Sequence, residues 1–560
     1  MLKFLRTLAC LPLLAAVAMP AAAAPKAPET LNVTVLGTTD IHGHIYPTDY
    51  FSKSEDAPFG LARVYTVVKQ LRATHAHTLL VDSGDSLQGT PLTYWSARVA
   101  PAGDPNPMVT AYNFMHYDAF AVGNHEYNYG IPYIEKARRE AHYPYLSANI
   151  FKHGTNQYVY KPYVFRYVGG AKIAIVGFTT PGVMIWDRHN VEGKQDFRNI
   201  VACAKKVIPE VKARGADAIV VIIHSGLGAP YEPTFDGYSA SAGAPPENVS
   251  AALADACPEI TAILMGHTHE NIPKKVEHGV LLTEADKWGA HLAEVDLHFT
   301  REHGRWVVTS KDCRTIDTRH AKPDPELMAA VKSAHEATLG YVQSAIGTST
   351  EAMTAKESLL HDTPIIDFIN EVQCADTGAQ LSAASVFNDA AAVPKGKVSV
   401  ADIASLYVYD NTLTKVSITG KQLKDYLEAS AKFYNDYKPG APIFNDKVPS
   451  YNYDMISGVD YDVDVTKPVG QRIENLTYQG KPVTDGEKFS LALNSYRQNG
   501  GGGFTMLKDA PVQQAVPTGI RDLLIDYVQT HKVIDPKQFS HENWHLVPAG
   551  CVAADGQHYK

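Results

Sequence analysis

The chain has 560 residues, of which 45% are hydrophobic and 20% are charged. This length exceeds what one hydrophobic core covers, so we expect at least two domains, and the composition excludes a disordered, collagen-like or coiled-coil chain. The formal net charge is −9 and the 51 Lys and Arg residues form no basic run, so a nucleic-acid polymer is not an expected partner.

The N-terminal segment has the layout of a cleavable export signal. Lys3 and Arg6 precede an apolar run over 7–19, which is followed by the small residues 21–24. This order is typical of secretory signals, and the run is too short to span a bilayer. We expect residues 1–24 to be removed and the mature protein to be periplasmic or secreted, without membrane contact.

From about residue 31 to residue 318, short apolar runs alternate with longer segments of mixed polarity. The runs have the length of strands and are rich in Val, Ile and Leu: 31–37, 78–81, 119–122, 172–178, 218–223 and 260–265. The intervening segments 60–75 and 199–214 have helical spacing. Strands alternating with helices predict an α/β layered domain, which we place at 25–322.

The remainder of the chain is predicted to form a connector and a second domain. Residues 323–344 begin with Pro-Asp-Pro-Glu and continue with Ala, Leu and Lys, which is typical of a capped helix. We expect this helix to link the two domains. The second domain is predicted at 345–549, with a helix over 420–433, and residues 550–560 form a tail.

Exported proteins can form disulfides. Five cysteines remain after the predicted cleavage: Cys203, Cys257, Cys313, Cys374 and Cys551. An odd number leaves at least one free thiol or an intermolecular bond. A Cys203–Cys257 bridge is possible, but the sequence does not decide the pairing.

Acidic, amide and imidazole side chains directly follow five of the six apolar runs. They are Asp40, His42, Asp85, Asn124, His125, His224, His267 and His269. Ligands of α/β sheets bind at the carboxyl ends of strands, so we expect these side chains to lie together. Imidazole and carboxylate ligands suit zinc, manganese or iron. A single histidine at a strand end is more often structural, but five such motifs in order favour a metal site.

The motifs D-x-H, G-D-x-x-x-G, G-N-H-E, H-S-G and G-H-T-H together resemble those of calcineurin-like dinuclear metallophosphoesterases. The extent of the second domain narrows the resemblance to the secreted 5′-nucleotidase superfamily. This implies an αββα four-layer sandwich followed by a smaller α+β substrate-binding domain. It also implies two divalent metal ions (Mn, Zn, Co or Fe). One would be held by Asp40, His42, Asp85 and His269, and the other by Asp85, Asn124, His224 and His267.

The same resemblance places His125 beside the leaving group, where an imidazole can stabilise the phosphoryl group or protonate the departing oxygen. Many 5′-nucleotidases have an Asp three residues later, whereas this chain has Asn128. An amide can orient the ring but adds no negative charge, so we expect the imidazolium to be less favoured. The Asn is typical of the cyclic-nucleotide branch, whose G-N-H-E-x-N-Y-G motif matches residues 123–130.

The second domain resembles the same branch, the bacterial 2′,3′-cyclic-nucleotide 2′-phosphodiesterase/3′-nucleotidases. The similar segments are 381–388, 406–413, 475–481 and 494–504. Segment 381–388 lacks the phosphate-binding Arg that 5′-nucleotidases have at this place. By this resemblance, Tyr409 and Tyr496 would sandwich the base. The glycine run 500–503 has no Lys-Ser/Thr after it, so we expect it to let the backbone approach a nucleoside and not to form a phosphate loop.

These resemblances imply an enzyme that acts on small-molecule nucleotides. We expect a monomer, but the sequence does not decide the oligomeric state. The enzyme would open 2′,3′-cyclic nucleotides to 3′-nucleotides and convert these to nucleosides and phosphate. The alternative enzyme is a 5′-nucleotidase or UDP-sugar hydrolase. Asn128 and the missing Arg argue against this alternative. A nucleotide-binding protein on a degenerate phosphatase scaffold is the alternative outside enzymes, although none of the seven ligand positions is lost.

Overall fold

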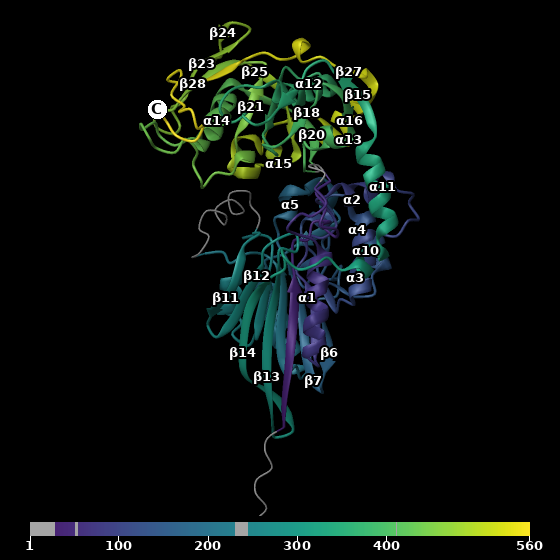
Figure 1. Ribbon diagram of the computed structural model, residues 1–560. Helices are drawn as coiled ribbons and strands as arrows, with labels where there is room; N and C mark the ends of the chain where they lie inside the picture. Colours follow the sequence, from purple (N-terminus) through teal and green to yellow (C-terminus); the bar gives the residue numbers. More distant parts are fainter. Residues whose placement is uncertain (1–28, 51–53, 230–244, 410) are drawn as a thin grey trace, which may run out of the picture.

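The computed structural model describes residues 29–50, 54–229, 245–409 and 411–560. The predicted export signal at 1–24 lies outside these residues. Figure 1 shows two halves stacked on each other, with the strand-rich N-terminal half below and the C-terminal half above. Within the described parts of the chain, no helix is long and apolar enough to cross a membrane. All five described cysteines are free thiols.

The N-terminal half contains two six-stranded sheets. The first has the order β14(Arg305–Asp317), β13(His291–Glu302), β1(Thr30–Thr38), β2(Thr78–Asp82), β3(Ala119–Ala121), β4(Tyr145–Leu146). The second has the order β11(Asn271–Glu277), β12(Val280–Ala285), β10(Ala262–Met265), β9(Ala218–His224), β7(Ala171–Thr179), β6(Tyr163–Val168). Strands β1 to β4 are parallel, as are β7, β9, β10 and β12. The carboxyl ends of the predicted strands therefore share one edge in each sheet.

Helices cover the outer face of each sheet. The first sheet is covered by α1(Leu61–Thr74), α3(Pro107–Met115), α4(Ile131–Glu140) and α10(Pro325–Ala330). The second is covered by α7(Ile200–Ala213) and α9(Ser250–Ala256). In β1, Val35 packs between the two sheets and Leu36 packs under the helices, because successive strand residues face opposite sides. Both faces are covered, which explains the continuous apolar runs. The expected αββα sandwich is confirmed.

The segment between the halves forms two helices, α10 and α11(Lys332–Gln343), where the sequence predicted one. The Asp324 carboxylate accepts hydrogen bonds from the backbone of Glu326 and Leu327 and so caps α10. The chain leaves helical geometry at Val331, whose φ is −117° and whose side chain is buried in the core beneath α1 and α3. The break between α10 and α11 therefore coincides with a buried side chain. Figure 1 shows α11 running upward alongside both halves.

The C-terminal half is an α+β unit with a core of its own. Its five-stranded sheet has the order β21(Asp454–Ser457), β17(Leu381–Ser385), β25(Lys488–Asn494), β20(Thr412–Thr419), β26(Val512–Gly519). Two smaller sheets have the orders β24(Lys481–Pro482), β23(Ile473–Tyr478), β22(Asp460–Asp464), β28(Trp544–Val547) and β19(Gly396–Ser399), β15(Ala345–Ser349), β27(Val533–Ile534). The main helices are α12(Pro364–Thr377), α13(Val400–Ala404), α14(Gly420–Ser430) and α16(Ile520–His531).

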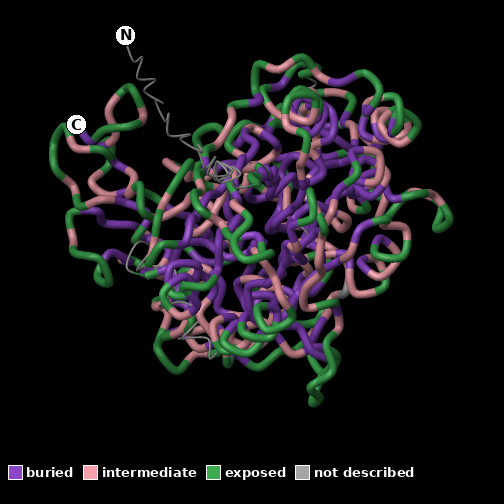
Figure 2. Tube along the Cα trace, turned by 90° about the horizontal axis from the view of Figure 1, so that it is seen from below, coloured by how far each residue is buried: buried purple, intermediate pink, exposed green. Residues whose placement is uncertain are grey.

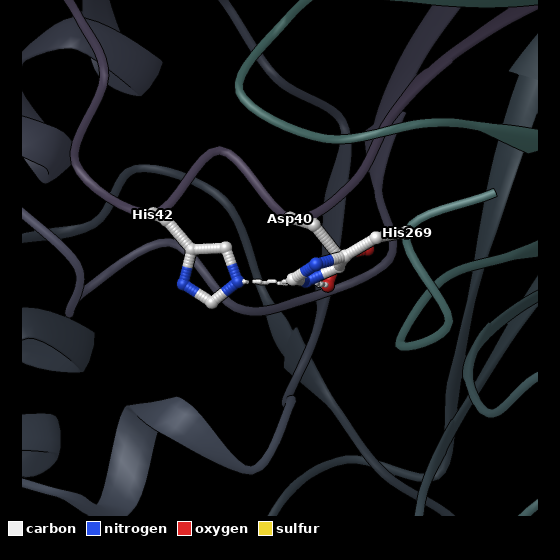
Figure 3. A group of neighbouring side chains, drawn as sticks. All are labelled: Asp40, His42 and His269. Atoms are coloured by element: carbon white, nitrogen blue, oxygen red, sulfur yellow. Dashed lines mark hydrogen bonds and ion pairs between the residues drawn. The ribbon is translucent and has the colours of Figure 1, made fainter. Parts of the chain in front are cut away.

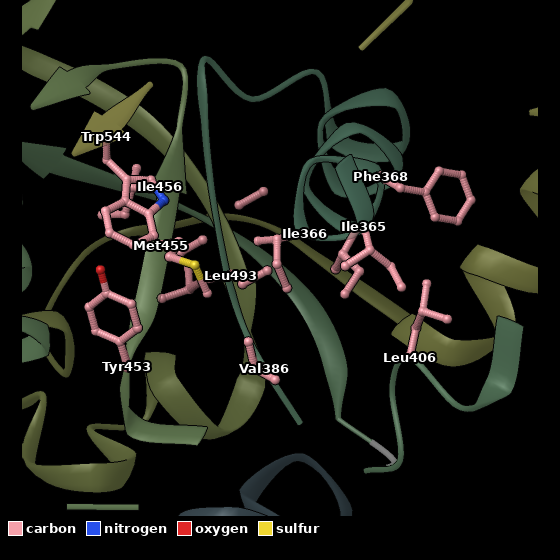
Figure 4. Close-up of a cluster of buried hydrophobic side chains, with 14 of the residues drawn as sticks. Ile365, Ile366, Phe368, Val386, Leu406, Tyr453, Met455, Ile456, Leu493 and Trp544 are labelled. Atoms are coloured by element: carbon pink, nitrogen blue, oxygen red, sulfur yellow. The ribbon is translucent and has the colours of Figure 1, made fainter. Parts of the chain in front are cut away.

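The core of this half lies between α12 and the five-stranded sheet. Figure 4 shows Ile366 of α12 facing Met455 and Leu493 of the sheet, with Trp544 at the far side. Viewed from below in Figure 2, buried segments gather in the middle of the molecule and exposed loops surround them. Short elements complete the fold: α2(Pro91–Tyr94), α5(Val183–Trp186), α6(Arg188–Val191), α15(Ser495–Gln498), β5(Ile150–Lys152), β8(Gln195–Phe197), β16(Met353–Thr354) and β18(Ala392–Val393).

The two halves contact each other beside α11. The hydroxyl of Tyr94, in α2, donates a hydrogen bond to Asp522 of α16. The guanidinium of Arg521 lies over the Tyr94 ring at 5.2 Å, and its Nε donates to the Tyr407 carbonyl at 2.7 Å. This contact ties the N-terminal half to the segment that leads into Tyr409.

A buried ion pair holds α15 in place. Arg497 and Asp454 are both almost fully buried, and the guanidinium donates to both carboxylate oxygens, at 2.5 and 3.0 Å. Ser385 and Tyr426 donate to the same carboxylate. Because Tyr496 precedes Arg497 in α15, this network also fixes the position of the tyrosine.

Removing Asp454 is expected to destabilise the C-terminal half. Asp454→Ala leaves the buried guanidinium without its counter-ion, which costs about 3–5 kcal/mol in comparable pairs. Urea unfolding followed by circular dichroism measures the loss. Asp425→Ala removes the carboxylate of the solvent-exposed pair with Lys421 and serves as the control, with little change expected. Equal unfolding midpoints for the two variants would contradict a stabilising role for the buried pair.

Candidate metal centre and active site

The first group of predicted ligands lies at the carboxyl end of β1 and in the loop after β10. His42 Nε2 and His269 Nε2 are 3.1 Å apart, and Asp40 Oδ1 is 3.4 Å from His269 Nε2 and 3.8 Å from His42 Nε2. Figure 3 shows the three side chains converging. Ligand atoms of the three residues lie within 4.8 Å of one another, so the group has the geometry to hold a metal ion.

The second group lies at the carboxyl ends of β2, β3, β9 and β10. His224 Nε2 is 2.9 Å from Asp85 Oδ2 and 3.0 Å from Asn124 Oδ1. The ring of His267 lies 5.1 Å from that of His224, and Asp85, His224 and His267 form a second set that satisfies the same 4.8 Å limit. The structure therefore brings together all seven residues that the sequence predicted as ligands.

Asp85 lies between the two groups. Its Oδ2 atom is 2.9 Å from His224 Nε2 and 3.9 Å from His42 Nε2. A carboxylate in this position can contact two cations, which would offset their mutual repulsion at a separation of roughly 3.5–4 Å.

Backbone carbonyls orient two of the histidines. His42 Nδ1 is 2.9 Å from the Gln88 carbonyl, and His224 Nδ1 is 2.9 Å from the Ser83 carbonyl. A carbonyl only accepts, so Nδ1 carries the hydrogen and the Nε2 atoms face the centre. Histidines that bind metals are commonly oriented in this way.

Much of the centre has strained backbone. Five of the seven predicted ligands have φ in the left-handed region: Asp40 (51°), His42 (47°), Asp85 (60°), His267 (87°) and His269 (58°). Such conformations cost about 1–3 kcal/mol each and concentrate at functional sites. They turn the side chains away from the ordinary strand direction and toward the centre.

Glycines allow the ligand loops to pack closely. A Cβ atom on Gly123 would lie 2.2 Å from Asp85 Oδ1, and one on Gly266 would lie 2.0 Å from Thr39 Oγ1. Neither position has room for a side chain, which explains the glycine beside each ligand in these two motifs.

The charges of the centre shift the pKa values of its histidines in opposite directions. Burial would raise the pKa of Asp85, but the imidazoles of His224 and His125 outweigh it and hold the pKa well below its usual range. Burial would likewise lower the pKa of His224, yet the Asp85 carboxylate raises it to about 10. By contrast, burial and repulsion from His125 lower the pKa of His42 to about 3.

Glu126 was missed as a functional residue by sequence reasoning, although it lies inside the G-N-H-E motif. Its buried carboxylate accepts backbone hydrogen bonds from Asp85, Ser86, Leu87 and Gly123, at 2.9, 2.7, 3.1 and 2.7 Å. Glu126 thus joins the loop after β2 to the loop after β3. Together with the hydrogen bond from the His125 backbone N–H to Asp85 Oδ1 at 2.8 Å, it holds the ligands of the two loops close to each other.

His125 lies beside the centre, and its Nε2 atom is 4.0 Å from Asp85 Oδ2. On the other side of the ring, Nδ1 is 2.6 Å from Asn128 Oδ1. The amide in turn donates from Nδ2 to Asp187 Oδ2 at 2.9 Å. Burial would lower the pKa of His125, but Asp85, the Asn128 hydrogen bond and Asp187 together raise it. The negative charge that Asn128 itself does not provide therefore comes partly from Asp187.

Tyr409 and Tyr496 lie in the C-terminal half. The half-buried Tyr409 ring meets Phe387 and Tyr451 edge-on, at 5.6 and 6.2 Å between ring centres. Tyr496 is in α15, where the Arg497 guanidinium lies 5.5 Å from its ring. A Cβ on Gly501 would lie 2.5 Å from the Tyr496 ring. The glycine run thus makes room for a protein side chain here, where we had expected a nucleoside.

Parts of the C-terminal half approach the metal-ligand loops. Helix α15 lies beside α5, as Figure 1 shows, and Trp186 of α5 has its ring 5.3 Å from that of His267. The buried Glu247 has its Oε1 atom 3.9 Å from His267 Nε2. Burial and, to a smaller extent, the charge of Glu247 raise the pKa of Tyr451 in the C-terminal half. Neither Trp186 nor Glu247 directly follows a predicted strand, so the sequence offered no signal for them.

Comparison with known proteins agrees with this arrangement. Residues 33–271 match the calcineurin-like phosphoesterase family, and residues 345–509 match the C-terminal domain of 5′-nucleotidases. The crystal structure of a "putative 5′-nucleotidase" from Staphylococcus aureus aligns with a TM-score of 0.80 and 26% identity, covering 92% of this chain and all of that one. The fold and site thus define a two-domain metallophosphoesterase of the 5′-nucleotidase type.

Two relatives identify a narrower family within this class. A 2′,3′-cyclic-nucleotide 2′-phosphodiesterase/3′-nucleotidase of Haemophilus influenzae is 33% identical, with 93% of this chain and 88% of that protein covered. Its counterpart in Salmonella typhimurium is 32% identical, with 93% and 89% covered. The chain belongs to the 2′,3′-cyclic-nucleotide 2′-phosphodiesterase/3′-nucleotidase family.

Removing the Glu126 carboxylate is expected to weaken divalent-metal binding. Glu126→Ala leaves four buried backbone N–H groups without an acceptor, and the ligand loops then lose their spacing. Titration calorimetry with Mn²⁺ should show about 10–100-fold weaker binding, as for other outer contacts of metal ligands. Glu135→Ala, which removes a partner of Arg138 on the surface of α4, is the control. Unchanged Mn²⁺ affinity in Glu126→Ala would show that the loops keep their spacing without it.

Proposed function

We propose that the protein is a two-metal phosphohydrolase that opens 2′,3′-cyclic nucleotides to 3′-nucleotides and then releases nucleosides and phosphate. The observation that carries this proposal is the position of Asp85 between two ligand groups, with His125 at their side. Asp40, His42, Asp85 and His269 would hold one ion, and Asp85, Asn124, His224 and His267 the other. The imidazole, carboxylate and amide donors fit Mn, Zn, Co or Fe.

The protein's own residues supply the rest of the chemistry. Bound metal ions would stabilise charge on the phosphate oxygens and activate a water molecule. His125 presents Nε2 toward the centre, where it can stabilise the phosphoryl group or donate a proton to the departing ribose oxygen. Asn128 orients the ring from behind through its hydrogen bond to Nδ1.

Base binding is assigned to the C-terminal half. Tyr409 and Tyr496 would stack on the two faces of the base, and stacking tolerates any base because each has a π-face. The contact of α15 with α5, whose Trp186 lies against His267, supports a substrate site between the halves. The monomer contains both parts, so a partner subunit is not required.

The proposed cellular location rests on the sequence of the first 24 residues. Their layout supports export, and we propose that the mature protein works in the periplasm or outside the cell. There it would scavenge small nucleotides, with no nucleic-acid polymer and no membrane as partner.

A substrate panel tests the proposed function. The purified protein should hydrolyse 2′,3′-cAMP and 3′-AMP, with 5′-AMP turned over much more slowly, and EDTA should abolish the activity until Mn²⁺, Co²⁺ or Zn²⁺ is added. Product chromatography should show 3′-AMP and then adenosine. A preference for 5′-AMP or UDP-glucose would establish the 5′-nucleotidase alternative, and nucleotide binding without turnover would establish a binding protein.

The base clamp makes a separate prediction. Aromatic stacking contributes roughly 1–3 kcal/mol per base, so Tyr409→Ala or Tyr496→Ala should lower kcat/KM for 3′-AMP by about 5- to 150-fold. Hydrolysis of bis-p-nitrophenyl phosphate, which has no base, should change much less. Tyr409→Phe and Tyr496→Phe should each retain most activity, because the face of the ring and not its hydroxyl makes the contact. If both Ala variants keep the wild-type kcat/KM on nucleotides, the two tyrosines do not stack on the base and this part of the proposal is wrong.

A further inference from the structure

Asp187 is a buried carboxylate behind the proposed catalytic histidine. It ends α5 and precedes α6, and only 3% of its surface is exposed. Its Oδ2 atom accepts from Asn128 Nδ2 at 2.9 Å, and its Oδ1 atom accepts from Asn190 Nδ2 at 3.2 Å. Asn190 Nδ2 also donates to the Tyr127 carbonyl at 2.8 Å. Asp187 follows none of the predicted strands, and no motif of the sequence includes it.

The direction of these hydrogen bonds is set by what each group can donate. An ionised carboxylate only accepts, so the NH₂ end of the Asn128 amide must face Asp187. The carbonyl end then faces His125, and because a carbonyl also only accepts, His125 Nδ1 must carry a hydrogen. The other ring nitrogen, Nε2, is left to face the metal-ligand side, 4.0 Å from Asp85 Oδ2.

An asparagine alone would not define this arrangement. Its amide can turn over and present either a donor or an acceptor to His125. The buried carboxylate removes this choice. A histidine–aspartate pair would orient the ring with one residue, whereas this chain places the carboxylate one amide farther from the ring.

We propose that Asp187 is a positioning residue for the reaction, which acts through Asn128 to hold His125 with Nε2 facing the phosphate. This inference rests on the proposed function, because it gives His125 a role in turnover. The competing view is that Asp187 only stabilises the turn between α5 and α6 through Asn190.

Exchanging the side chains of Asn128 and Asp187 distinguishes a positioning role of Asp187 from a purely structural one. Asp187→Asn lets the Asn128 amide turn over, so kcat on 3′-AMP should fall by about 10–100-fold, with little change in KM. Loss of an outer contact to a metal-binding histidine has an effect of this size. Asn128→Asp alone places two carboxylates side by side and should also lower kcat. The double variant Asn128→Asp/Asp187→Asn puts one carboxylate beside His125 and one amide behind it, and should recover most of the activity.

Three controls accompany the exchange. Asn190→Ala removes a partner of Asp187 at the turn and should change kcat less than about 3-fold. His125→Ala shows the loss expected when the histidine is absent. Elemental analysis and thermal unfolding of every variant should match the wild type in bound metal and midpoint.

The outcomes distinguish this inference from the proposed function. If the wild type hydrolyses no nucleotide, the proposed function fails and the inference fails with it. If the wild type is active but Asp187→Asn stays within about 3-fold of it, the inference alone is overturned. A double variant no more active than Asp187→Asn, or an equal loss in Asn190→Ala, would likewise reduce Asp187 to a structural role at the turn.

Discussion

The position of the Asp85 carboxylate is the constraint on which the rest of the site depends. One oxygen lies within 4 Å of imidazoles from two strands that belong to different sheets. The two sheets must therefore meet at their carboxyl ends to within a side-chain length. Gly123 and Gly266 make this approach possible because neither position has space for a Cβ atom. Glu126 helps to hold the loops after β2 and β3 together by accepting four backbone hydrogen bonds.

Such a centre is costly to fold. It combines buried carboxylates, imidazoles that face one another and a run of left-handed backbone conformations. Each of these features is unfavourable by itself. The apolar layers on both faces of each sheet provide the stability that offsets them. Bound cations would lower the cost further, since ligands that bind only the folded state stabilise it.

Under the proposed function, the C-terminal half would add the aromatic side chains that bind the base. Its aromatic residues lie on α15 and on the segment after α13, and both are held by buried arginines, Arg497 and Arg521. Each arginine reaches backbone carbonyls or a carboxylate that belongs to another element. The position of the tyrosines is therefore tied to the core of this half and to its contact with α2.

The sequence by itself determined the layered α/β class, six of the strands along the chain and the polar residues that follow five of them. It could do so because a strand covered on both faces needs a continuous apolar run, and because its end is marked by an abrupt change to Asp, Asn or His. The break at Val331, the hydrogen bonds of Glu126 and the chain from His125 through Asn128 to Asp187 were decided only by the tertiary structure. These contacts join residues from different loops whose positions depend on how sheets and helices pack, and no local pattern of residues encodes that packing. The orientation of the Asn128 amide is the clearest case. The sequence leaves both orientations open, and the buried Asp187 carboxylate selects one of them.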